Sequence, residues 1–120
     1  MHELSIAHNL IEIVTEAAHE INAKRVEAIH LRLGALSGIV KDALLFSYEI
    51  AIEGTMLAGT RLEIEELPVV VFCPKCQTKR EIFNIQCFVC PECDTPISEI
   101  VQGREIEIVS LEISDEESSC

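Results

Sequence analysis

Residues 72–94, FCPKCQTKREIFNIQCFVCPECD, decide the fold, because they hold five of the six cysteines in the chain. Cys73 and Cys76 form one C-x2-C pair, Cys90 and Cys93 form another, and 13 residues separate the pairs. Two such pairs can place four thiolates at the corners of a tetrahedron, which is the donor set of a closed structural zinc site. The spacing therefore predicts Zn(II) bound by these four cysteines.

The segment around the cysteines offers little else to hold it together. Over about residues 70–98 the sequence shows little helical or alternating pattern beyond REIFNI, so metal ligation should supply much of its folding free energy. Pro74 and Pro91 follow the first cysteine of each pair and fix φ where the turn must tighten. A closed tetrathiolate leaves no open position for a substrate, so the site is predicted to be structural.

Two alternatives remain open from the residues alone. Cys87 stands three residues before Cys90 and could exchange places with one of the four ligands. Four thiolates could also hold iron in a rubredoxin-like centre, although the low aromatic content of 4% is unlike such proteins. Cys120 is the last residue, and no role is assigned to it.

On either side of this segment, the sequence pattern predicts helices and strands in alternation. Apolar residues recur at three- and four-residue steps over residues 4–23 and 41–52, which predicts two amphipathic helices. Apolar and polar residues alternate over residues 26–34, 60–67 and 104–113, which predicts three strands. We therefore expect an α+β fold: a small three-stranded sheet with two helices and one acidic, solvated face, and an inserted zinc-ribbon-like module between the last two strands.

Composition and charge narrow the class of protein. The chain has 120 residues, is 48% hydrophobic and lacks tryptophan, so its core should be aliphatic. No apolar run approaches the roughly 20 residues of a membrane span, and the start does not read as a signal peptide, so we expect a cytoplasmic protein with no membrane contact. The formal net charge of −12 would repel nucleic acid.

The first three residues, Met1, His2 and Glu3, form a second candidate metal site. A bulky second residue disfavours removal of the initiator methionine, so the terminus offers the Met1 amine together with the amide nitrogen and imidazole of His2. A deprotonated amide is a strong in-plane donor, so this set suits square-planar Ni(II) or Cu(II) better than tetrahedral zinc. Glu3 could add its amide nitrogen or its carboxylate. On this chemistry alone, a solvated chain end is the commoner interpretation of a histidine at position two.

The same features occur together in a known family. They are MHELSIAHNLIEIV at residues 1–14, LGALSG at residues 33–38, CPKC at residues 73–76 and CPEC at residues 90–93. In this combination the chain resembles the HypA/HybF family of nickel metallochaperones, from Met1 to about Ile113. The resemblance implies transported Ni(II) bound by His2 and Glu3 with the terminal backbone, and structural Zn(II) bound by the four paired cysteines.

The resemblance also implies an organisation and a set of partners. Residues 1–68 and 103–114 would form a nickel-binding α+β domain, residues 69–102 a zinc-binding domain and residues 115–120 an acidic flexible tail. The partners would be the GTPase HypB and the large subunit of nickel–iron hydrogenase, and some relatives also serve urease maturation.

Two other functions compete with nickel delivery. One is a zinc-ribbon protein-interaction module without a nickel role, and the other is a rubredoxin-like electron carrier. An enzyme is not expected, because the sequence offers no nucleophile with a base and an orienting group and no glycine-rich phosphate loop. His8 and His19 are interpreted as solvated or boundary residues, and His30 lies on the polar face of its predicted strand, where it could form a hydrogen bond. None of the three is assigned to metal.

Overall fold

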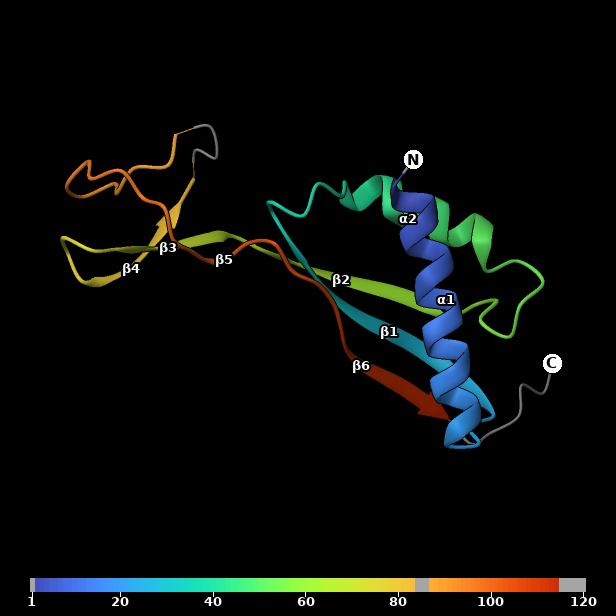
Figure 1. The fold of residues 1–120 in the computed structure, drawn as a ribbon. Coiled ribbons are helices and arrows are strands. Elements are labelled where there is room, and N and C mark those ends of the chain that lie inside the picture. Colours follow the sequence, from blue (N-terminus) through green and yellow to red (C-terminus); the bar gives the residue numbers. More distant parts are fainter. Residues whose placement is uncertain (1, 84–86, 115–120) are drawn as a thin grey trace. The chain divides into compact units, whose positions relative to one another are not determined.

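The structure, a computed structural model, describes residues 2–83 and 87–114, and of His2 it describes the backbone alone. The predicted α+β fold class is confirmed: two helices accompany two three-stranded sheets, ordered β2-β1-β6 and β4-β3-β5 (Figure 1). In chain order the elements are α1 (His2–Glu20), β1 (Arg25–Gly34), α2 (Lys41–Ala51), β2 (Arg61–Leu67), β3 (Val69–Cys73), β4 (Thr78–Ile82), β5 (Ile100–Gln102) and β6 (Ile106–Ser114).

The chain divides into two units by its internal contacts. The first, here called the helical unit, comprises Met1–Leu31, Ile39–Ile64 and Ile108–Cys120. The second, here called the cysteine unit, comprises Arg32–Gly38 and Glu65–Glu107. The predicted zinc-binding segment, residues 69–102, lies within the cysteine unit, and the predicted acidic tail, residues 115–120, lies outside the described residues.

The core of the helical unit is aliphatic, as the composition indicates. Helix α1 buries one stripe of side chains at three- and four-residue steps, and α2 joins it on the same face of the sheet β2-β1-β6 (Figure 1). The buried residues of this core are Ala7, Leu10, Val14, Ala18, Val26, Ile29, Leu31, Leu44, Tyr48, Ile52, Leu57 and Leu62. No helix in the described ranges combines the length and hydrophobicity that crossing a membrane requires.

Two linked hydrogen bonds lie within this aliphatic core. Thr60 is buried, and its Oγ1 donates a hydrogen bond to the carbonyl of Val26 at 2.7 Å. The hydroxyl of Tyr48 in turn donates to the carbonyl of Thr60 at 3.0 Å. These two bonds satisfy buried polar groups and join α2 to the first residues of β1 through the segment before β2.

The cysteine unit contains a sheet that the sequence did not predict. Strand β3 pairs antiparallel with β4, from Val69 opposite Ile82 to Cys73 opposite Thr78, and also with β5. The expectation of little regular structure here is therefore wrong for β3, because VVVFC is a short run of apolar residues whose alternating burial is invisible in the sequence. The buried centre of this unit is small, consisting of Val69, Val71 and Ile82.

Candidate metal centre

The structure gathers the four predicted cysteine ligands into one cluster. The Sγ atoms of Cys73, Cys76, Cys90 and Cys93 all lie within 4.8 Å of one another. Three of the separations are 3.6 Å (Cys73 to Cys93), 3.6 Å (Cys76 to Cys93) and 3.9 Å (Cys76 to Cys90). Tetrahedral Zn–S bonds of about 2.3 Å place sulfurs about 3.8 Å apart, so the donor set fits a zinc ion.

The two cysteine pairs are built in the same way. The residue after each second cysteine, Gln77 or Asp94, has a positive φ of 52° or 58°. Its N–H donates to the carbonyl of the first cysteine, at 2.7 Å from Gln77 to Cys73 and at 2.9 Å from Asp94 to Cys90. Each turn therefore closes on itself and presents two sulfurs on one side. Cys73 ends strand β3, so the first turn is also the hairpin between β3 and β4.

Hydrogen bonding within the cluster separates the acidities of its thiols. The Oγ1 of Thr95 lies 3.0 Å from the Sγ of Cys93, and hydrogen bonds from the Thr95 side chain and backbone lower the pKa of Cys93 to about 6. For Cys76 the largest influence, a hydrogen bond with Arg80, lowers the pKa. The sulfurs of Cys93 and Cys73 outweigh it, and the pKa rises to about 11. Four anionic sulfurs at this spacing repel one another, and a central divalent cation would compensate that repulsion.

Arg80 contributes a positive charge beside the cluster. Hydrogen bonds from its guanidinium to the sulfurs of Cys76 and Cys90 raise the pKa of Arg80. Its Nε is buried and finds no hydrogen-bond partner within the described part of the chain. Zn(II) with four thiolates carries a net charge of −2, so the positive charge of Arg80 would stabilise the zinc-bound cluster.

The remaining cysteines do not join this group. Cys87 is exposed and stands outside the four gathered sulfurs, so exchange with Cys90 gains no support from the described residues. Cys120 lies outside the described residues.

At the chain start, the structure places Glu3 but leaves the rest of the predicted nickel site open. Met1 and the side chain of His2 lie outside the described residues, and His2 is the first residue of α1. The amide of Val40 donates to Oε2 of Glu3 at 3.3 Å. Hydrogen bonds from the Glu3 amide and from Val40 lower the pKa of this carboxyl group. The assignment of His2 and Glu3 to nickel stays a prediction.

The other three histidines are not part of the cysteine cluster. His8 and His19 are exposed on α1. His30 contacts Glu112, with 2.6 Å between Nε2 and Oε2, and together with Glu63 these residues form a second group of potential metal ligands. The sequence did not indicate this group, because its members come from three strands whose register is invisible in the sequence.

Comparison with known proteins agrees with this description. The family model described as "Hydrogenase/urease nickel incorporation, metallochaperone, hypA" matches residues 1–113. The chain belongs to the HypA family. It is 57% identical over 112 residues to the hydrogenase maturation factor HypA of Chloroflexus aurantiacus, an alignment covering 93% of this chain and 98% of that protein.

Solved HypA structures share the fold. One, described as the solution structure of HypA protein, has 26% identity and a TM-score of 0.72, with 97% of this chain and 98% of that chain covered. The solution structure of the Ni metallochaperone HypA from Helicobacter pylori has 23% identity and a TM-score of 0.64, with 95% and 98% covered. The family predicted from the sequence is therefore confirmed. Its members are maturation factors and metallochaperones rather than enzymes, as expected.

Proposed function

We propose that the chain carries Ni(II) at its N-terminus and delivers it during maturation of nickel–iron hydrogenase. The observation that carries this proposal is the match to a nickel-incorporation family over residues 1–113, which includes the predicted ligands His2 and Glu3. The geometry around Glu3 supports it, because Val40 holds the carboxylate close to the start of α1.

The position of His2 at the start of a helix suits the proposed ligand set. The first four N–H groups of an α-helix have no partner within the helix, so the His2 amide can lose its proton and bind nickel without breaking a helical hydrogen bond. The Met1 amine, the His2 amide and the His2 imidazole then lie in one plane around the ion, with Glu3 as a further donor. The positive end of the helix dipole weakens the binding of a cation there, which favours release of the cargo.

Transfer follows from the openness of such a site. A planar four-coordinate ion leaves its axial directions free, so a ligand from the acceptor can bind before the terminal ligands leave. The cysteine cluster takes no part in this exchange. We propose that it holds Zn(II) permanently and that it shapes the cysteine unit, with Cys73, Cys76, Cys90 and Cys93 as ligands.

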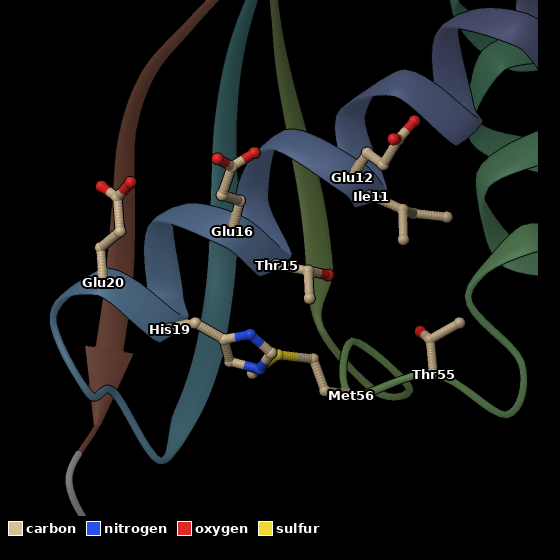
Figure 2. Close-up of a pocket in the computed structure, with 8 residues that line it drawn as sticks. All are labelled: Ile11, Glu12, Thr15, Glu16, His19, Glu20, Thr55 and Met56. Atoms are coloured by element: carbon tan, nitrogen blue, oxygen red, sulfur yellow. The ribbon is translucent and has the colours of Figure 1, made fainter.

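A groove beside α1 is the proposed contact for the partner GTPase HypB. The groove is open to solvent and has a volume of about 820 Å³; its lining residues are Ile11, Glu12, Thr15, Glu16, His19, Glu20, Thr55 and Met56. Figure 2 shows three of these side chains, Glu12, Glu16 and Glu20, following one another along α1, while Met56 comes from the loop after α2. An acidic edge beside an apolar floor suits a basic amphipathic segment. If charge reversal of the three glutamates left GTPase binding unchanged, this contact would be excluded.

The hydrogenase large subunit is the proposed recipient of nickel, and urease maturation is a second destination because the family description names both enzymes. The rival function, a zinc-ribbon interaction module without nickel, shares the cysteine cluster but not the terminal site. A rubredoxin-like carrier would instead bind iron and be red. Metal analysis and the colour of the purified protein separate this rival from a zinc protein.

The deciding experiment is a Ni(II) titration by calorimetry and absorption on the zinc-loaded protein with an untagged terminus. We expect a planar-nickel absorption band, and the site that produces it, to be lost in His2→Ala and kept in the control His8→Ala, which removes an exposed histidine of the same helix. Zinc content should stay the same in all three proteins. Equal binding by the parent and His2→Ala would place nickel elsewhere, and no binding by either would favour the zinc-ribbon module.

A further inference from the structure

A second group of metal-ligand side chains lies on the sheet β2-β1-β6. His30 stands between Ile29 and Leu31, which are buried in the core of the helical unit, so strand alternation places His30 on the opposite face. Glu63 of β2 and Glu112 of β6 come from the two neighbouring strands. One oxygen of each and a ring nitrogen of His30 all lie within 4.8 Å of one another.

We propose that His30, Glu63 and Glu112 form a binding site for a divalent transition-metal ion. One imidazole and two carboxylates are a donor set for ions such as Ni²⁺, Co²⁺ and Zn²⁺, whereas Mg²⁺ and Ca²⁺ favour oxygen ligands throughout. The donors come from three hydrogen-bonded strands, so the backbone already holds them close together. The ion completes its coordination with water, because the side chains of the group are 35% (His30), 48% (Glu63) and 52% (Glu112) exposed.

A positive side chain already occupies the space between the two carboxylates. The Nη2 atom of Arg61 lies 3.0 Å from Glu63 and 3.7 Å from Glu112. This guanidinium marks a place where cation binding is favourable, and it also competes with a metal ion for the same oxygens. Because the Arg61 side chain is 57% exposed, it can turn into solvent when an ion binds. Removing its charge should therefore strengthen metal binding.

The contact between His30 and Glu112 determines which proton a metal ion must displace from the imidazole. The Nε2 atom lies 2.6 Å from the Glu112 oxygen, so in the hydrogen-bonded form the Nε2–H donates to the carboxylate. Binding of a metal ion at Nε2 replaces that proton, which passes to Nδ1 in a neutral ring or to solvent from a charged ring. The carboxylate then binds the same ion beside the imidazole. This site uses none of the residues assigned to the cysteine cluster or to the chain start, so it stands independently of the proposed nickel delivery.

The test is a calorimetric titration with Ni²⁺ of zinc-loaded His2→Ala protein, which removes the terminal site. Backbone amide NMR locates the ion through paramagnetic broadening. We expect broadening centred on residues 30, 63 and 112. His30→Gln should weaken binding by at least about tenfold, since loss of even an indirect partner of a metal ligand typically costs about 10–100-fold. Arg61→Gln should strengthen binding about two- to fivefold, the size of an exposed ion pair's contribution.

Matched controls make the outcome decisive. His19→Gln removes an exposed histidine of α1, and Arg25→Gln removes an arginine paired with Glu27 at the start of β1. Both variants, made in the His2→Ala protein, should bind Ni²⁺ with the same affinity as the His2→Ala protein itself. Broadening centred away from the three strands, or affinity unchanged in both His30→Gln and Arg61→Gln, would overturn the proposal.

Discussion

The Val40 amide donates a hydrogen bond to the Glu3 carboxylate across 3.3 Å, which joins the first turn of α1 to the residue that precedes α2. Val40 is the N-cap residue of α2, and its own side chain forms no capping hydrogen bond. The Glu3 carboxylate therefore lies as an anion near the starts of both α1 and α2. Negative charge is favourable at the positive end of a helix, and this position keeps Glu3 ionised.

The first prediction concerns the stability that Glu3 provides. The pKa of Glu3 is lowered in the folded protein, so its contribution is present at pH values above the ordinary value of 4.5 and disappears as the pH falls through the folded value. Thermal unfolding at neutral pH should therefore show Glu3→Gln less stable than the parent, with the difference vanishing in acid. Glu53→Gln, an exposed turn residue, serves as the control. A deficit that persists in acid would assign the effect to something other than charge.

The second prediction concerns the ionisation of Tyr48. Burial raises its pKa from 10.0 to about 12. Between these two values the unfolded chain releases the phenolic proton more readily than the folded protein, so the free energy of unfolding should fall as the pH rises. Tyr48 is the chain's single tyrosine and tryptophan is absent, so tyrosinate absorbance reports this one group. A transition near pH 10 in the folded protein would contradict the prediction.

The contrast between α1 and β3 shows what the sequence could predict. The stripe of α1 repeats over five turns, so the helix was evident, and only its bounds differ: residues 4–23 were predicted and His2–Glu20 is observed. The pairing of β3 with β4 and β5 depends on register between short segments, which no local pattern encodes. The cysteine cluster was predictable because its ligand spacing is local, whereas the group of His30 requires three strands to be aligned.

The third prediction concerns Gly34 at the end of β1. A Cβ added here would overlap the carbonyl group of Gly103, whose oxygen accepts a hydrogen bond from the Leu36 amide at 2.6 Å. The overlapping atoms belong to the backbone, so relief requires the backbone to shift, and Gly34→Ala should cost about 3 kcal/mol in denaturant unfolding.

Gly59→Ala is the matched control for this substitution. Gly59 has a φ of +86° and nothing within 4 Å of its ideal Cβ, so the substitution meets only backbone strain. Its cost should be about 1–2 kcal/mol. Equal losses in both variants would show that close approach at Gly103 is not the cause.

The fourth prediction concerns metal removal. Cys90 is buried, and Cys90→Ser should release the ion and abolish the slow amide exchange of β3 and β4 while leaving that of α1. A strong chelator should have the same effect on the parent protein. Cys87→Ser, at an exposed cysteine outside the cluster, should retain the metal and the slow exchange. Protected β3 amides in metal-free protein would show that the apolar residues suffice.

The small buried centre of the cysteine unit has a consequence for the cell. Val69, Val71 and Ile82 are too few to stabilise this unit alone, so a newly made polypeptide would fold it only after binding an ion at its sulfurs. Under zinc starvation the helices would still form, but the cysteine unit, about two fifths of the molecule, would remain unfolded and open to proteases. If the chain delivers nickel as proposed, the supply of zinc would then limit how much nickel reaches its enzyme.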